Sequence, residues 1–460
     1  MSYRTEQDSM GAVQVPAAAH YGSQTQRAVD NFPASGLQPP IAFIRALARI
    51  KRHAAMVNRD LGLMEADCAS AIAAAAEEVL AGRLDDQFVV DLFQTGSGTS
   101  TNMNMNEVLA SRANEILTGR RGGRSPVHPN DHVNLGQSSN DLIPTALHLA
   151  ALVDIETRLR PAMETLAVRL ADLSERFGVI PKIGRTHLQD AVPMTMGQTF
   201  SGYARQAEAG GERLAAIGPR LCELALGGTA VGTGINTHPE FAANVIKALA
   251  ADTGLPLTEA RNHFEAQAAR DAVLETSGTL RTIAASLVKI ANDLRWLSSG
   301  PRCGLGELKL PALQPGSSIM PGKVNPVIPE AVIQIAYQVM GNDTTVMLAG
   351  QAGNFELNVT LPLLAHNLLQ SIGLLSLAAR QLTDRCLDRI EVDETTTRGY
   401  IENSLALVTG FVPHLGYDKA AELAKIAYAG GRTVRAVVRE SGLLEEAVID
   451  QVLGPPPSDE

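Results

Sequence analysis

Long runs of apolar residues, spaced three and four positions apart, constrain the fold of this chain more than any other feature. The clearest run lies between 144 and 177 and contains Leu149, Leu152, Ile155, Leu159, Met163, Leu166, Leu170 and Leu173. Similar patterns cover 198–226, 279–297, 329–340 and 361–387. This spacing predicts amphipathic α-helices, and several long helices in one region predict an elongated bundle. Alternation of β-branched residues is scarce, so we expect few and short strands.

The rest of the chain is also predicted to be mainly helical. Helices are predicted over 41–61, 66–80 and 107–117, and Pro161 is expected to bend the helix that contains it. Residues 1–40 and 119–140 are expected to be irregular. We therefore predict a mostly α subunit of three domains. They are an N-terminal domain over 1–138, a central helical bundle over 139–391 and a small helical domain over 392–460.

The bundle helices carry small and apolar residues on more than one face. A helix that is apolar over a wide arc must be buried on several sides. Either one helix lies at the centre of a large bundle, or the bundle continues into neighbouring subunits. Several helices, rather than one, carry apolar residues over a wider arc than one bundle needs. This favours the second explanation, in which the bundle continues into neighbouring subunits.

Composition narrows the class of protein. A chain of 460 residues exceeds what one hydrophobic core normally organises, and its formal net charge of −10 argues against a general nucleic-acid binder. The four cysteines are widely separated, which disfavours a zinc site or a disulfide framework and fits a reducing compartment. We find no apolar segment typical of a signal peptide and no run of about 18 apolar residues, so a cytoplasmic protein is expected.

The segment 316–326 is the most informative polar segment. It combines the hydroxyls of Ser317 and Ser318 with the cation of Lys323 and the amide of Asn325. Two glycines and two prolines exclude a regular helix or strand. A loop of this kind before an apolar helix is suited to hold a small anion. The alternative is a surface turn with solvated side chains.

Two further polar segments precede predicted helices. The first, 95–102, is rich in glycines and hydroxyls and suits a carboxylate or phosphate at a helix N-terminus, although it lacks the P-loop pattern. The second, 128–141, ends in Ser138, Ser139 and Asn140, which are good capping residues as well as candidate ligands of an anion. Its two histidines and two aspartates fit no common zinc spacing.

His187 is the candidate acid or base, because it lies among hydroxyl, guanidinium, amide and carboxylate groups in 184–191. Glu330 falls in the first turn of a predicted helix, where it either interacts with the helix dipole or orients His187. The glycine-rich stretch 227–234 follows a helical pattern rather than a strand, which argues against a dinucleotide loop.

Along nearly its whole length the chain resembles the fumarase/aspartase superfamily. The segment 316–326 matches the signature of that superfamily almost letter for letter, and the other polar segments follow in the right order. The resemblance implies a three-domain helical subunit and a homotetramer whose central helices form one multi-helix core. It also implies active sites built from loops of three subunits.

Within the superfamily, the chain most resembles class II (iron-independent) fumarases. Ser97 and Ser139 stand where aspartases usually carry Ala and Thr, and 350–359 is also similar to fumarases. The segment 327–330, Val-Ile-Pro-Glu, is by contrast common in aspartases. Aspartate ammonia-lyase is therefore the nearest alternative, and a non-catalytic structural relative is the alternative of another class.

The resemblance implies a hydro-lyase of the tricarboxylic acid cycle that interconverts fumarate and L-malate through an aci-carboxylate intermediate, without metal or organic cofactor. It assigns proton abstraction to Ser317 and the handling of water to His187, oriented by Glu330. The implied substrate-binding residues are Ser97, Gly98, Thr99, Ser138, Ser139, Asn140, Thr186, Ser318, Lys323, Val324 and Asn325.

The family also has a second dicarboxylate site at the entrance. The matching residues here are His128, Pro129, Asn130 and Asp131. Where family members carry Arg, this chain has Ser125, with Arg124 one place away.

Overall fold

The computed structural model describes residues 2–33 and 35–454. In this part of the chain, seventeen α-helices alternate with short strands that form five two-stranded sheets. This confirms the prediction of a mostly α protein with few strands. Contacts divide the chain into two compact units, and the three-domain division stays a prediction. Unit 1 comprises Met1–Pro161, Gly211–Ala284 and Ile335–Leu377, and unit 2 comprises Ala162–Gly210, Ala285–Gln334 and Ala378–Glu460.

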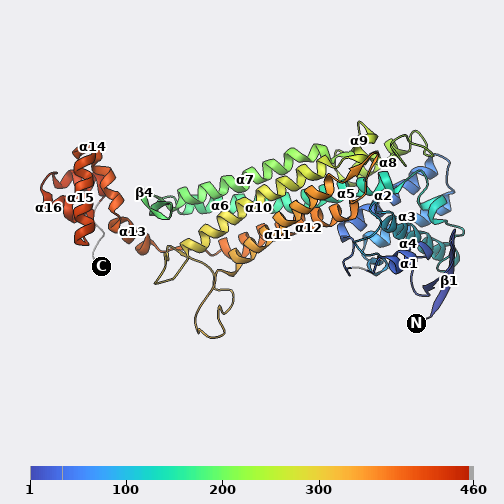
Figure 1. Ribbon diagram of the computed structural model, residues 1–460, viewed down its shortest axis with the longest axis horizontal. Coiled ribbons are helices and arrows are strands. Elements are labelled where there is room, and N and C mark those ends of the chain that lie inside the picture. The colour runs from blue at the N-terminus through green and yellow to red at the C-terminus, as the bar shows by residue number, and fades with distance from the viewer. Residues whose placement is uncertain (1, 34, 455–460) are drawn as a thin grey trace. The chain divides into compact units, whose positions relative to one another are not determined.

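Unit 1 is a packed set of helices around α2. Helix α2 contacts α3, α5 and α8, while α3 and α1 both contact α4 (Figure 1). The Ala-rich sequence of α3 favours a helix, and α4 ends at Gly119 in the left-handed conformation that glycine adopts readily. Its helices are α1 (Ser23–Asn31), α2 (Ile41–Asp60), α3 (Ala66–Leu80), α4 (Thr99–Thr118), α5 (Ser139–Asp154), α8 (Phe241–Thr253) and α9 (His263–Ala268). Its strands are β1 (Tyr3–Asp8), β2 (Gly11–Pro16), β5 (Glu223–Leu224), β6 (Thr258–Glu259), β8 (Gly353–Asn354) and β9 (Leu357–Asn358).

Long helices contribute to both units. They are α6 (Arg160–Arg176), α7 (Met196–Leu221), α10 (Asp271–Leu297), α11 (Val327–Gly350) and α12 (Leu361–Gln381). Inside unit 1, buried Asn342 of α11 donates hydrogen bonds to Gln370 and Ser371 of α12. Inside unit 2, the Tyr203 hydroxyl of α7 donates to Asp293 of α10 at 2.8 Å. These polar contacts fix which faces of the apolar helices meet.

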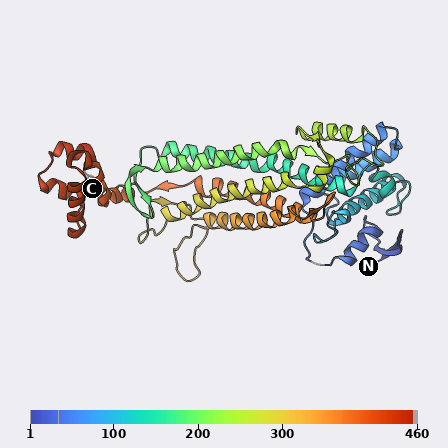
Figure 2. The ribbon, with the colours of Figure 1, turned by 45° about the horizontal axis from the view of Figure 1, so that its top comes forward.

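Unit 2 carries a β-hairpin and a long excursion of the chain. The hairpin consists of β3 (Pro181–Thr186) and β4 (Gln189–Thr195), paired antiparallel. Part of the segment between α10 and α11 projects away from those helices as an open loop (Figure 2). Its small sheet joins β7 (Leu308–Lys309) to β10 (Glu391–Val392).

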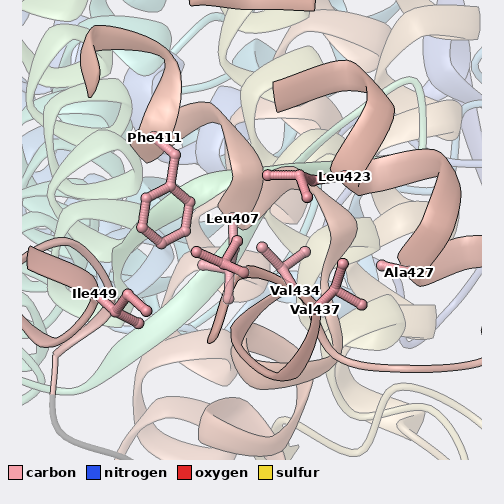
Figure 3. Packing of buried hydrophobic residues seen from close by; sticks show 8 residues of the cluster. Leu407, Phe411, Leu423, Ala427, Val434, Val437 and Ile449 are labelled. Atoms are coloured by element: carbon pink, nitrogen blue, oxygen red, sulfur yellow. The ribbon is translucent and has the colours of Figure 1, made fainter. Parts of the chain in front are cut away.

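The C-terminal part of unit 2 has a small core of its own. Leu407, Phe411, Leu423, Ala427, Val434, Val437, Val438 and Ile449 form one buried cluster, and the labelled members point toward one another in Figure 3. Leu407 and Phe411 come from the 3-10 helix Leu405–Phe411, and the others come from α15 (Tyr417–Gly430), α16 (Val434–Ser441) and α17 (Glu446–Leu453). Partly buried Ile401 of α13 (Glu394–Asn403) and Leu415 of α14 (Val412–Leu415) pack against this cluster. These elements are helical, as expected from the sequence, and the boundary of a C-terminal domain at 392 stays a prediction.

Three sequence expectations need correction. Residues 1–40 are not irregular throughout, because β1 and β2 form a six-pair hairpin and α1 follows them. Helix α4 begins at Thr99, eight residues before the predicted start at 107. The predicted helix over 144–177 starts at Ser139 and contains a π-helical turn at Ile155–Leu159, which ends two residues before Pro161.

Among the described residues, one helical stretch, Leu361–Leu387, is long and apolar enough to cross a membrane by length and composition alone. Within its most apolar window, 67% is buried. Buried core helices of soluble proteins commonly pass this test.

Candidate active site

The first candidate loop lies at the N-terminus of α4 in unit 1. Gly98 is the N-cap at a φ of +73°, and an added Cβ would lie 3.0 Å from the side chain of Ile143. The hydroxyls of Ser97 and Thr99 lie 2.8 Å apart and share a hydrogen bond. Both hydroxyls therefore lie together at a helix N-terminus, where the helix dipole favours a negative charge.

The second candidate loop lies at the N-terminus of α5 in the same unit. Ser138 is the N-cap and forms a capping box with Asp141, so the capping interpretation is confirmed. The two loops are linked, because the Asn102 amide of α4 donates to the Ser139 hydroxyl at 2.9 Å. Asn140 donates to the carbonyl of Ala230 at 2.8 Å.

A buried polar network supports these two loops from beneath. The amide oxygen of Asn134 accepts from Lys51 at 2.9 Å, from Asn102 at 3.1 Å and from Asn106 at 3.2 Å. Lys51 is fully buried, and burial holds its pKa well below the usual range, against the opposing charge of Asp141. The network connects one buried cation to both candidate loops through amide side chains.

The carboxylate of Asp141 anchors the glycine-rich stretch. Its Oδ2 accepts from the backbone N–H groups of Gly227 at 3.0 Å and Thr229 at 2.9 Å. Burial raises the pKa of Asp141, and its backbone hydrogen bonds and Lys51 act in the opposite direction. The stretch 227–234 therefore packs onto the second candidate loop, which agrees with the rejection of a dinucleotide loop.

The candidate entrance site lies in a π-helical turn, Pro129–Val133. Nδ1 of His128 accepts from the backbone N–H groups of Asn130 at 3.2 Å and Asp131 at 3.1 Å. Burial lowers the pKa of His128, and the nearby charges of Arg124 and His132 lower it further against Asp131. The charge of Arg124 therefore acts on His128, although Ser125 occupies the position where family members carry Arg.

In unit 2, His187 lies at the exposed tip of the hairpin between β3 and β4. Thr186 pairs with Gln189, so His187 and Leu188 form a two-residue turn, with φ values of 56° and 60°. Such turns favour glycine or asparagine, and other residues there hold backbone strain. The backbone of His187 is strained, and its side chain is exposed to solvent rather than packed into the core.

Strand β3 of the hairpin is tied to buried Glu307. Arg185 contacts Glu307 at 2.9 Å, Lys182 lies at 3.9 Å from it, and the Arg185 guanidinium stacks over the ring of Tyr400. Arg185 therefore supports the hairpin.

The loop 316–326 has its own internal order. The Ser317 hydroxyl accepts from the backbone N–H groups of Ile319 at 3.2 Å and Met320 at 2.9 Å. Asn325 donates to the carbonyl of Gly316 at 2.7 Å, and the Gly316 N–H donates to the carbonyl of Lys323 at 2.7 Å. The remaining candidates, Ser318, Lys323 and Val324, are exposed.

Glu330 lies in the first turn of α11, as predicted. Among the described residues, no hydrogen bond or ion pair joins it to His187. Their functional pairing stays a prediction. In the same part of the chain, no group of three or more His, Cys, Asp or Glu side chains could hold a metal ion.

Sequence reasoning missed Lys51, Asn102 and Asn134 as supports of the candidate loops. One signal was available for Lys51, because this lysine falls on the apolar side of a predicted amphipathic helix. The amides gave no such signal, since the two partners of Asn102, Asn134 and Ser139, are 32 and 37 residues away in the sequence.

Known protein families match most of the chain. Residues 11–341 match the family described as Lyase, and residues 407–456 match the family described as Fumarase C C-terminus. A protein named fumarate hydratase class II from Nitrosomonas europaea is 54% identical over 453 residues, covering 98% of each chain. A protein of the same name from Thermosynechococcus vestitus is 52% identical, covering 97% of this chain and 96% of that protein.

Solved structures share the fold. The crystal structure of a class II fumarase from Schistosoma mansoni aligns with a TM-score of 0.95 and 41% identity, covering 98% of both chains. A fumarate lyase:delta crystallin structure from Brucella melitensis aligns with a TM-score of 0.93 and 46% identity, again covering 98% of both chains.

Proposed function

The chain belongs to the class II fumarate hydratase family, and we propose on this basis that it is a hydro-lyase that catalyses the reversible hydration of fumarate to L-malate. The observation that carries the proposal is the order inside the loop 316–326, where Ser317 Oγ accepts two backbone N–H groups. A reaction of the tricarboxylic acid cycle in the cytoplasm agrees with the family resemblance.

Ser317 is the proposed base. In the dehydration direction it removes a proton from the carbon next to a carboxylate of malate, which leaves an aci-carboxylate with doubled negative charge. A free hydroxyl is a poor base, so its alkoxide needs stabilisation. The N–H groups of Ile319 and Met320 supply donors for that oxygen.

His187, oriented by Glu330, is proposed to handle the water that adds or leaves. His187 lies at an exposed hairpin tip with a positive φ, which supports this role, because residues held in strained backbone conformations cluster at functional sites. Lys323 and Asn325 are proposed to hold one substrate carboxylate. Further hydrogen bonds are assigned to Ser97, Gly98, Thr99, Ser138, Ser139, Asn140, Thr186, Ser318 and Val324.

The entrance site is proposed to bind a second dicarboxylate at His128, Pro129, Asn130 and Asp131. The charge of Arg124 on His128 supports it, because this arginine stands one place from the family position. A dicarboxylate would be attracted by that positive charge.

The subunits are proposed to form a homotetramer whose active sites take loops from three subunits. Exposed apolar side chains on α11 support this, since Tyr337, Met347 and Leu348 are more than half exposed. The candidate residues are also divided, with the first two loops in unit 1 and the loop 316–326 in unit 2.

One assay separates the alternatives. Absorbance of fumarate in the ultraviolet is followed with malate and then with aspartate, each in the presence of a chelator. Turnover of malate alone supports a fumarate hydratase that needs no metal. Turnover of aspartate supports an aspartate ammonia-lyase, and turnover of neither substrate supports a structural relative.

A further inference from the structure

A cavity outside all of the proposed catalytic loops lies beside the N-terminus of α10 in unit 1. Its volume is about 280 Å³, close to the lower end of ligand-binding pockets, which span roughly 300–1,000 Å³. The residues that line it include His148 of α5, Arg270, and Glu265 and Ala266 of α9. None of the residues assigned above to substrate binding or catalysis is part of this lining.

Arg270 is the unusual member of the lining. Only 2% of its surface is exposed, yet Nε and Nη1 have no hydrogen-bond partner among the described residues. Its Nη2 donates to the carbonyl of Ala266. Burial lowers the pKa of Arg270 to about 10, so the guanidinium is still charged at neutral pH. A buried cation with unpaired donors is costly unless another group meets them.

The other charged groups of the cavity do not supply that partner. Arg220 is paired with Glu275 at 2.8 Å, and Arg261 is paired with Glu223 at 2.6 Å. His148 is held by a contact of 3.0 Å between its Nδ1 and the carbonyl of Glu223. Of the arginines in the lining, only Arg270 lacks an ion pair within the part of the chain described.

Two exposed carboxylates, Glu265 and Asp271, also border the cavity. Their negative charges act on Arg270 from a distance. The charges of Arg270, Glu265 and Asp271 sum to −1, so a dianion such as phosphate near neutral pH is disfavoured more than a monoanion. A ligand with a single negative charge is therefore favoured.

The backbone adds to the attraction. Arg270 directly precedes α10, a helix of 27 residues that begins at Asp271. The first N–H groups of a helix have no partner inside the helix, and the helix dipole favours an anion there. A carboxylate also matches the planar geometry of a guanidinium.

We propose that this cavity binds a small monocarboxylate, with Arg270 as its anchor. The ligand meets the unpaired guanidinium at the start of α10. The site is separate from fumarate hydration and does not depend on it.

Crystals of the full chain, grown without carboxylates or phosphate, test the position of the ligand. Soaking with sodium acetate at neutral pH is expected to give density for acetate against Arg270. Soaking with sodium phosphate is expected to leave the cavity without phosphate. Two results overturn the proposal: only ordered water against Arg270 in the acetate soak, or a carboxylate side chain from a second copy of the chain in the cavity.

Melting temperature against sodium acetate tests the site in solution, with sodium chloride at matched ionic strength as the salt control. Arg270→Met is expected to melt at or above wild type without acetate, because an unpaired buried cation is gone. The rise in melting temperature with acetate is expected to be smaller in Arg270→Met than in wild type. Arg220→Met, in the same lining but ion-paired, is the matched control and is expected to keep that stabilisation.

Acetate can also bind at the proposed catalytic loops, and both variants retain these loops. A difference between the acetate responses of the two variants therefore reports on the cavity alone. Equal acetate responses in Arg270→Met and Arg220→Met would overturn the proposal. Should Arg270→Met fail to fold, Arg270→Lys keeps the charge but loses the planar fork. It is expected to show a smaller acetate response than Arg220→Met, and an equal response again rejects the site.

Discussion

The ammonium group of Lys51 lies 2.9 Å from the amide oxygen of Asn134, in a fully buried position beneath both candidate loops of unit 1. Asn134 accepts from Asn102 as well, and Asn102 donates to Ser139. The buried amine of Lys51 is thus connected through two amide side chains to a hydroxyl that is proposed to bind substrate.

Lys51→Met is expected to lower the free energy of unfolding by about 2 kcal/mol, because it leaves a buried amide oxygen short of a charged donor. The apparent KM for malate should rise, since the Ser139 hydroxyl loses its fixed position. Urea unfolding and steady-state kinetics measure the two effects. Lys247→Met is the matched control, because Lys247 is an exposed lysine on α8. Equal stability of both variants would contradict the role of the network.

Gly98 and Gly119 cap the two ends of α4 with almost the same φ, +73° and +74°. An added Cβ at Gly98 meets Ile143 at 3.0 Å, while at Gly119 nothing lies within 4 Å. Gly119→Ala should therefore cost about 1 kcal/mol for backbone strain alone, and Gly98→Ala about 2 kcal/mol because of the added contact. Thermal or urea unfolding compares them. The explanation fails if Gly119→Ala is the more damaging substitution.

Burial lowers the pKa of His148 to about 4, and the charge of Arg270 acts in the same direction. Above pH 6.5 this histidine is neutral in both the folded and unfolded chains. Between pH 6.5 and 4 the unfolded chain binds a proton that the folded chain does not, so stability falls as the pH falls. Below pH 4 both states are protonated and the effect of His148 on the slope ends.

His148→Gln should therefore lose stability less steeply than wild type between pH 6.5 and 4. The glutamine amide can still donate to the carbonyl that His148 contacts. Urea unfolding at several pH values gives the slope. Identical slopes in the two proteins would show that His148 is not the buried neutral group.

Periodicity predicted the helices well where apolar spacing alone decides the structure. The predicted bounds of α3, 66–80, agree with the structure, and α2 differs from its prediction by one residue. In contrast, α4 extends over Thr101, Asn102 and Asn104. These residues are polar, so the sequence pattern predicted a loop, but they are buried in the structure. Their side chains find distant partners such as Gln94 and Gln87, and a local pattern cannot show such partners.

The candidate residues could be named from sequence, but not their supports. The segment 316–326 matches a family signature, so Ser317 and Lys323 can be identified by their positions in that motif. Strain at His187 depends on the hairpin register, and the unpaired donors of Arg270 depend on what surrounds that side chain. Both properties come from tertiary contacts, which single-sequence reasoning does not supply.

His187 tests the acid–base role at the hairpin tip. His187→Asn is expected to lower kcat at least about 100-fold, since general acid–base catalysis contributes roughly that much or more. Asparagine tolerates a positive φ, so the turn should persist and the melting temperature should stay within a few degrees. Leu188→Asn, at the neighbouring positive φ, is the control for the turn itself and should retain most activity. Equal kcat values for the two variants would remove His187 from the mechanism.

Ser317→Ala tests the proposed base, with absorbance of fumarate as the readout and malate as the substrate. Since Ser317 Oγ also orders the loop by accepting from Ile319 and Met320, Ser317→Thr serves as the variant that retains a hydroxyl. Circular dichroism and size-exclusion chromatography should show for both variants the same fold and oligomer as wild type. The account predicts that kcat of Ser317→Ala falls at least about 100-fold and that Ser317→Thr retains more activity than Ser317→Ala. A kcat for Ser317→Ala near the wild-type value would contradict the assignment of Ser317 as the base.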